Sequence, residues 1–230
     1  MAAIANSFYT ESVSAPSPID ETVVGVHGIF GNPTSLQFIV SGLKKEGREI
    51  INWGYPSRSK MIEQHGADLV QKVLRAVAEK HPGKPIHFVV HSMGGLVLRA
   101  ALSHPDCPQE AKMGKAVLLG TPNKSPSWGR YLGQFELPKK FGGIAGQQLM
   151  SQEGFDSIGE LPSTVDALVI AGSAGINPFI SGENDGTVAV EETHLKTPHR
   201  HIVLKTGHKL MLLDRKVRSA VAEFLYTSKN

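Results

Sequence analysis

The sequence predicts an α/β domain in which a mostly parallel sheet carries helices on both faces. Apolar stretches of strand length alternate with longer stretches of helical periodicity from about residue 22 to residue 226, and this alternation is typical of parallel sheets. Residues 86–91 form a continuous apolar run, as expected for a strand buried on both faces. The 230 residues, 40% of them hydrophobic and 20% charged, suit a single globular domain.

The first strand is predicted at residues 22–27, where an apolar run leads into a glycine-rich turn. The next strand is predicted at residues 49–53. Between them we expect a helix at about residues 35–46 because four apolar side chains recur there at helical spacing. These side chains are Leu36, Ile39, Val40 and Leu43.

The strongest helical periodicity covers residues 60–80, where apolar side chains form one stripe and Pro82-Gly83 follows its end. Beyond this helix, strands and helices keep alternating through the remainder of the domain. Strands are predicted at residues 86–91, 116–119, 167–171 and 201–204, and helices at residues 94–104 and 214–226.

Two segments depart from the alternation. Residues 1–20 are rich in Ala, Ser and Pro and are expected to form an irregular N-terminal arm, which leaves residues 21–230 as the domain. Residues 121–163 combine aromatic side chains with many Gly and Pro between two core strands. Because long irregular insertions in compact domains are usually functional, we expect this segment to be a small cap or loop insertion over the site.

Composition excludes several classes of protein. The net charge is +3, without a long basic run that carries aromatic residues, so nucleic acid is not an expected partner. Cys107 is the only cysteine, which rules out an internal disulfide and fits a reducing compartment. Residues 1–20 do not resemble a signal peptide, and no apolar run has the length of a membrane helix. We expect a cytoplasmic location, unless a signal peptide has been removed.

Ser92 is the predicted nucleophile. It lies in residues 88–97, FVVHSMGGLV, where a buried strand runs into a serine and two glycines open a helix. Such a nucleophile elbow needs small neighbours, and its helix directs free N–H groups at developing negative charge. Gly94 and Gly95 are small, whereas Val90 occupies the position of the first glycine in the usual G-x-S-x-G pattern. Taken alone, the same pattern also describes a serine that caps a helix.

Acyl transfer also requires two N–H donors that stabilise the tetrahedral oxyanion. In a nucleophile elbow one donor is the residue after the nucleophile, here Met93, and the other lies in a loop after an earlier strand. The His27-Gly28 turn is well placed to supply the second donor from Ile29 or from Phe30, and we favour Ile29. His27 itself is expected to be a structural histidine.

Position in the chain selects His208 as the base and Asp185 as the acid. His208 follows the last predicted strand, and sites in parallel sheets lie at the carboxyl ends of strands. Asp185 precedes it and would orient the imidazole, although Asn-Asp-Gly is also an ordinary turn. The other histidines near the last strand, expected to be solvated or structural, are His194, His199 and His201; the rival acids are Glu183, Asp156 and Asp166.

These motifs resemble those of lipase and esterase members of the α/β-hydrolase superfamily. The resemblance covers about residues 22–226 and rests on four segments: residues 91–95, the His27-Gly28 loop, residues 120–123 and residues 184–188. It implies the α/β-hydrolase fold and a reaction without cofactor or metal, through an acyl-enzyme that water hydrolyses. The implied site is a triad of Ser92, Asp185 and His208 with an oxyanion hole formed by Ile29 and Met93.

The expected substrate is a small-molecule carboxylic ester or other acyl compound. Phe30 and Trp128 are the candidate substrate-binding residues, and Trp128 with Phe135 also leaves transient lipid contact open. A thioesterase or an acyltransferase would use the same triad, and a non-catalytic ligand-binding homologue is a further alternative. A metal enzyme built on the clustered histidines is not expected, because no cysteine or carboxylate spacing supports it. The sequence does not indicate the oligomeric state.

Overall fold

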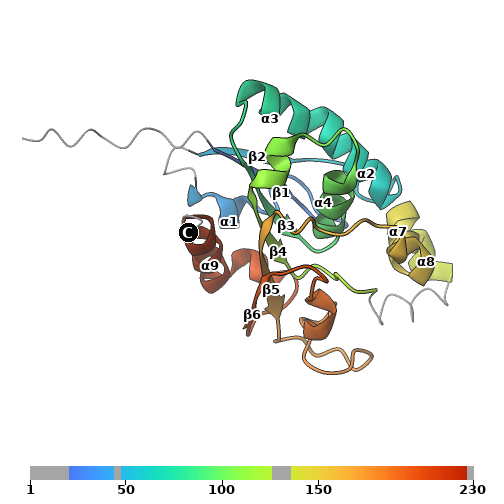
Figure 1. The fold of residues 1–230 in the computed structure, drawn as a ribbon. Helices are drawn as coiled ribbons and strands as arrows, with labels where there is room; N and C mark the ends of the chain where they lie inside the picture. The colour runs from blue at the N-terminus through green and yellow to red at the C-terminus, as the bar shows by residue number, and fades with distance from the viewer. Residues whose placement is uncertain (1–20, 44–47, 126–135, 227–230) are drawn as a thin grey trace, which may run out of the picture.

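Six strands form one parallel sheet in the computed structural model, which describes residues 21–43, 48–125 and 136–226 (Figure 1). The strand order is β2-β1-β3-β4-β5-β6, and every neighbouring pair is parallel. The chain therefore changes direction across the sheet between β1 and β3, and such switch points carry the ligand sites of open α/β sheets. The strands are β1 Thr22–Val26, β2 Glu49–Trp53, β3 Ile86–His91, β4 Lys115–Leu119, β5 Asp166–Gly172 and β6 Arg200–Leu204.

Helices cover both faces of this sheet, as predicted (Figure 1). The α-helices are α1 Gln37–Val40, α2 Ile62–Leu69, α3 Arg75–Lys80, α4 Met93–Ser103, α5 Gln109–Met113, α7 Glu136–Leu149, α8 Gln152–Asp156 and α9 Arg215–Tyr226. A π-helical segment, η2 Val70–Leu74, joins α2 to α3, and short 3-10 helices lie at η3 Val190–Thr193 and η4 Leu210–Leu213. Within the described ranges, no helix combines the length and apolar character needed to cross a membrane.

Strand side chains alternate between two hydrophobic clusters, one on each face of the sheet. In β3, Phe88 and Val90 pack with side chains of α2, η2, α3 and α4, whereas Val89 packs with those of α1 and α9. Since successive side chains of a strand point to opposite faces, this division shows that the sheet is buried on both sides. The continuous apolar runs of the sequence follow from this double burial.

The helix expected at about residues 35–46 is much shorter among the described residues. It begins only at Gln37, because the preceding turns are stabilised by hydrogen bonds from Ser35 N to Asn32 O and from Asn32 N to the Ser35 hydroxyl. Leu36 and Leu43 are buried nonetheless. The apolar periodicity therefore identified buried positions correctly but overestimated the helix, and residues 44–47 lie outside the described residues.

The segment at residues 121–163 is less irregular than its composition indicates. Its described part contains α7 and α8, and α7 is kinked at Gly143, where φ is +62°. The kink lies against the segment that follows β2, because Ile144 N donates a hydrogen bond to Arg58 O (2.9 Å). Gly146 of α7 also approaches the Ile29 side chain. This part of the segment thus contacts the loops that follow β1 and β2; Trp128 and Phe135 lie outside the described residues.

Candidate active site

Ser92 lies at a sharp turn between β3 and α4. Its backbone has φ +53° and ψ −128°, and among the described residues only Phe30 is another non-glycine with positive φ. Such a conformation costs about 1–3 kcal/mol and persists only where its surroundings impose it. Hydrogen bonds from Ser92 N to Leu119 O (2.9 Å) and from Gly95 N to Ser92 O (3.0 Å) hold the turn. The strained conformation is the one that a nucleophile elbow requires.

The elbow depends on close approach of neighbouring backbone. A Cβ on Gly94 would overlap the carbonyl oxygen of Val26 at the end of β1, and one on Gly28 would lie 2.8 Å from the Cβ of Ser92. Val90 is fully buried in the hydrophobic cluster beneath α4 and does not prevent the turn from forming. The start of α4 therefore packs directly against the loop after β1.

The structure brings Ser92, His208 and Asp185 together. His208 Nε2 lies 3.0 Å from Ser92 Oγ, and His208 Nδ1 lies 2.6 Å from Asp185 Oδ2. The other carboxylate oxygen of Asp185 accepts hydrogen bonds from the backbone N–H groups of Thr187 (2.9 Å) and Val188 (2.8 Å). One carboxylate oxygen thus accepts the hydrogen bonds of the Asn-Asp-Gly turn, while the other contacts His208. A turn at this position and a contact between Asp185 and the histidine are therefore compatible.

None of the rival acids lies in this arrangement. Glu183 and Asp156 are exposed. Asp166 is the first residue of β5 and lies at the amino ends of the strands, whereas Ser92 follows the carboxyl end of β3. The histidines near β6 form a separate cluster in which the rings of His194 and His201 stack with centroids 3.9 Å apart. In the part of the chain that the structure describes, no three His, Cys, Asp or Glu side chains are arranged to hold a metal ion.

His91 is a neighbour of the site that the sequence reasoning missed. Its Nε2–H donates to the backbone oxygen of His208 (2.9 Å), and the two rings lie 4.8 Å apart. Burial, reinforced by the charge of His208, lowers the pKa of His91 to about 3. His91 therefore stays neutral and helps to hold the loop that carries His208. Only its position next to Ser92 could have singled it out in the sequence.

Gly120 belongs to the segment 120–123 that carries the resemblance, but its contact with Asp185 and His208 was not predicted. It has φ +53°, and a Cβ built on it would lie 3.1 Å from both Asp185 Oδ2 and His208 Nδ1. Gly120 therefore lies against the hydrogen bond between these two side chains. Both the left-handed backbone conformation and the limited space favour a glycine at this position.

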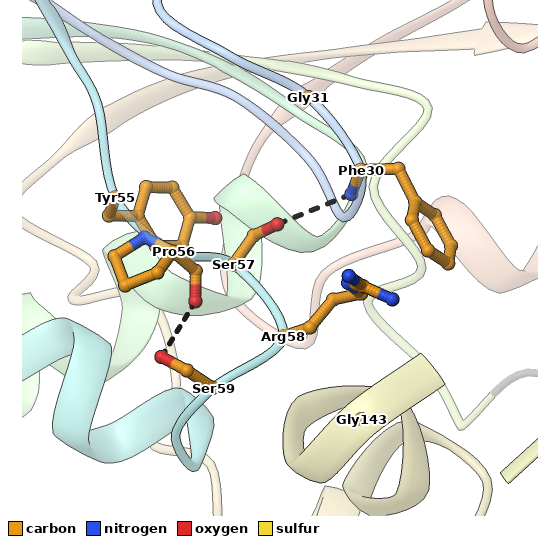
Figure 2. Close-up of a pocket in the computed structure, with 8 residues that line it drawn as sticks. All are labelled: Phe30, Gly31, Tyr55, Pro56, Ser57, Arg58, Ser59 and Gly143. Atoms are coloured by element: carbon orange, nitrogen blue, oxygen red, sulfur yellow. Dashed lines mark hydrogen bonds between the residues drawn. The ribbon is translucent and has the colours of Figure 1, made fainter. Parts of the chain in front are cut away.

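The loop after β1 contains Ile29, one of the two predicted oxyanion donors, and forms one wall of a pocket. Neither Ile29 N–H nor Met93 N–H donates a hydrogen bond to any described residue, whereas Phe30 N–H donates to the Ser57 hydroxyl (3.2 Å). The pocket has a volume of about 610 Å³ and opens beside Phe30, whose side chain is 60% exposed. Figure 2 shows its lining residues: Phe30, Gly31, Tyr55, Pro56, Ser57, Arg58, Ser59 and Gly143.

The first part of the chain is similar to a family model of serine esterases. Residues 18–119, which include Ser92 but not Asp185 or His208, match a family model described as "Putative serine esterase (DUF676)". A comparison with curated proteins gave no match.

Solved structures with similar folds include enzymes that act on esters and on thioesters. The mature form of Bacillus licheniformis lipase BlEst2 is 22% identical with a TM-score of 0.69, over 94% of this chain and 96% of that chain. The type II thioesterase BorB from the borrelidin biosynthetic cluster is 14% identical with a TM-score of 0.58, over 96% and 97% of the two chains. A thermophilic esterase from Thermogutta terrifontis is 15% identical with a TM-score of 0.55, over 89% of each chain. Such identities relate the fold and not the substrate.

Proposed function

We propose that this chain, which has the α/β-hydrolase fold that its sequence predicts, hydrolyses carboxylic esters through an acyl-enzyme on Ser92. The observation that carries the proposal is the continuous hydrogen-bonded series from Ser92 Oγ through His208 to Asp185, at 3.0 and 2.6 Å. A nucleophile, a base and an orienting acid in this geometry define the triad mechanism, whatever their order in the chain.

The proposed mechanism gives each side chain a role. Asp185 accepts a hydrogen bond from the Nδ1–H of His208, so that the lone pair of Nε2 faces the Ser92 hydroxyl. Ser92 Oγ attacks the acyl carbonyl while His208 takes its proton, and the protonated histidine then gives that proton to the departing alcohol. In the second half of the reaction, His208 activates a water molecule that cleaves the acyl-enzyme and regenerates the serine.

Ile29 N–H and Met93 N–H are the proposed oxyanion donors. Met93 is the first residue of α4, so its N–H is one of the free donors at a helix N-terminus. Ile29 follows Gly28, whose backbone packs against Ser92, and the alternative donor Phe30 is engaged by Ser57. This difference supports the choice of Ile29 over Phe30.

The pocket beside Phe30 is the proposed binding site for one side of the substrate. Its aromatic and polar lining suits an acyl or alcohol group of moderate size. The role of Trp128, transient lipid contact, small-molecule specificity and a cytoplasmic location stay predictions. Thioester hydrolysis is the second candidate, because the triad does not select the leaving group and the type II thioesterase BorB has a similar fold.

Fluorophosphonate labelling and turnover of p-nitrophenyl esters of increasing acyl length test the proposal on wild type and Ser92→Ala. Ser59→Ala is the matched control, since Ser59 lines the pocket but its hydroxyl donates only to Pro56 O in the described structure. We expect wild type and Ser59→Ala to label and turn over, and Ser92→Ala to do neither. A wild type inert to both esters and thioesters would instead support a ligand-binding homologue without catalysis.

A further inference from the structure

The loop after β1 is held by the segment that follows β2. The Tyr55 hydroxyl donates a 2.7 Å hydrogen bond to His27 O, and the Tyr55 ring stacks on the His27 ring with centroids 4.5 Å apart. Burial raises the pKa of Tyr55 above its usual range, which keeps this hydroxyl protonated as a donor. Because β2 pairs with β1 throughout its length, the residues after the two strands emerge side by side.

The second attachment lies three residues further along the loop, at Phe30. Phe30 has φ +61°, a conformation that residues with a side chain rarely adopt. Its N–H donates to the hydroxyl of Ser57, which is 6% exposed (Figure 2). The hydrogen bond therefore stabilises an unfavourable backbone conformation inside a segment that also contacts Ser92 through Gly28.

We propose that Ser57 is a positioning residue for the oxyanion hole. Its hydroxyl engages Phe30 N–H and holds Phe30 in the left-handed conformation, which leaves Ile29 N–H as the donor that the loop directs to the oxyanion. This inference rests on the proposed function, in which Ile29 and Met93 stabilise the tetrahedral intermediate.

Loss of the Ser57 acceptor would act on the reaction rather than on substrate binding. Without it, Phe30 can relax towards negative φ, and this relaxation re-orients the adjoining peptides, including the one that carries Ile29 N–H. Preorganised donors stabilise the transition state more than the ground state, and a misplacement of about 1 Å can cost up to about a hundredfold in rate. An oxyanion defect should therefore lower kcat and leave KM nearly unchanged.

The test compares Ser57→Ala and Ser57→Cys with Ser41→Ala and Ser41→Cys. Cysteine keeps nearly the volume of serine but is a weak hydrogen-bond acceptor, so it preserves packing if alanine leaves a void. We expect both Ser57 variants to lose about tenfold or more in kcat, with KM within about twofold of wild type. The Ser41 variants, whose hydroxyl donates to Phe38 O at the end of α1 and lies outside the pocket, should keep the wild-type kcat.

A trifluoromethyl ketone inhibitor supplies the decisive readout, because its adduct with Ser92 places an oxyanion in the hole. Its inhibition constant should rise in the Ser57 variants by about the same factor as kcat falls, while the pH midpoint of kcat stays at the wild-type value. Wild-type kcat in both Ser57 variants, or a loss confined to KM, would overturn the positioning role while the proposed function stands. An inert wild type would overturn both.

Discussion

Gly120→Ala would test whether the pair Asp185–His208 works as the geometry indicates. A Cβ at this position would lie 3.1 Å from each of the two hydrogen-bonded atoms and 3.2 Å from the Cε of Met211. These separations are tighter than ordinary van der Waals contact, so the neighbours must shift by a few tenths of an ångström. The shift acts directly on the 2.6 Å hydrogen bond that orients the imidazole.

The variant Gly83→Ala separates the backbone cost of an alanine at positive φ from the effect of the contact between that alanine and the Asp185–His208 pair. Gly120 has φ +53° and Gly83 has φ +73°, so alanine at either site adopts a left-handed conformation that costs about 1–2 kcal/mol. Gly83, however, has nothing within 4 Å of an added Cβ. Gly83→Ala therefore reports the backbone cost alone, and Gly120→Ala reports the same cost plus the contact with the acid–base pair.

The assay combines urea unfolding with kcat and KM for a p-nitrophenyl ester. We expect Gly83→Ala to lose about 1–2 kcal/mol of unfolding free energy and to keep wild-type kcat. Gly120→Ala should lose at least as much stability, and its kcat should fall by about tenfold or more because the base is displaced. If folded Gly120→Ala had the kcat of Gly83→Ala, the claim that this contact disturbs a catalytic pair would be refuted.

Three other substitutions address the acid, a buried histidine and the elbow. Asp185→Asn should keep the oxygen that accepts from Thr187 and Val188, so we expect near-normal stability but a kcat lower by about 10³–10⁴-fold from the wrong tautomer of the base. The depressed pKa of His91 (about 3) contributes stability that is present above about pH 6.5 and is lost as pH falls. From pH 7.5 to 5.5 this loss is about 1.4 kcal/mol. In His91→Gln the unfolding free energy measured in urea should therefore fall by about 1.4 kcal/mol less over this pH range than it does in wild type. Val90→Gly should cost about 3 kcal/mol through a cavity and added backbone freedom; a rise in its kcat above wild type would contradict the view that valine is harmless here.

Much of the fold could be predicted because the sheet is buried on both faces. A parallel strand buried on both faces is apolar along most of its length, and this marks β1, β3, β4 and β5 as runs in the sequence. The less buried β2 and β6 carry shorter apolar runs, yet the observed bounds of all six strands lie within two residues of the predicted ones. The helix expected at residues 35–46 was overestimated for the same reason, since apolar spacing reports burial. Turns stabilised by side chains such as Asn32 and Ser35 also bury apolar residues without a helix.

The three triad candidates could be predicted from chain order and from the rule that sites lie at the carboxyl ends of parallel strands. The residues that contact the site around these candidates could not be predicted in the same way. Ser57 reaches Phe30 only because β2 pairs with β1, and Gly120 reaches His208 only because β4, β5 and β6 are neighbours in the sheet. Contacts of this kind depend on three-dimensional placement. The segment 120–123 contributes to the family resemblance, but no local pattern in the sequence assigns the contacts of Gly120 or of Ser57.

Val90 shows how a motif can depart from its usual pattern without loss of the geometry that it describes. The first and last positions of G-x-S-x-G are not equivalent in this fold. Gly94 at the last position meets the backbone of β1, where a Cβ would overlap a carbonyl oxygen that cannot move aside. Val90 instead points into the hydrophobic cluster beneath α4, next to its register partner Val26, where added apolar volume is stabilising. A search for this type of elbow should therefore keep the glycine at the position of Gly94, because it meets rigid backbone. The same search can accept other apolar residues at the position of Val90.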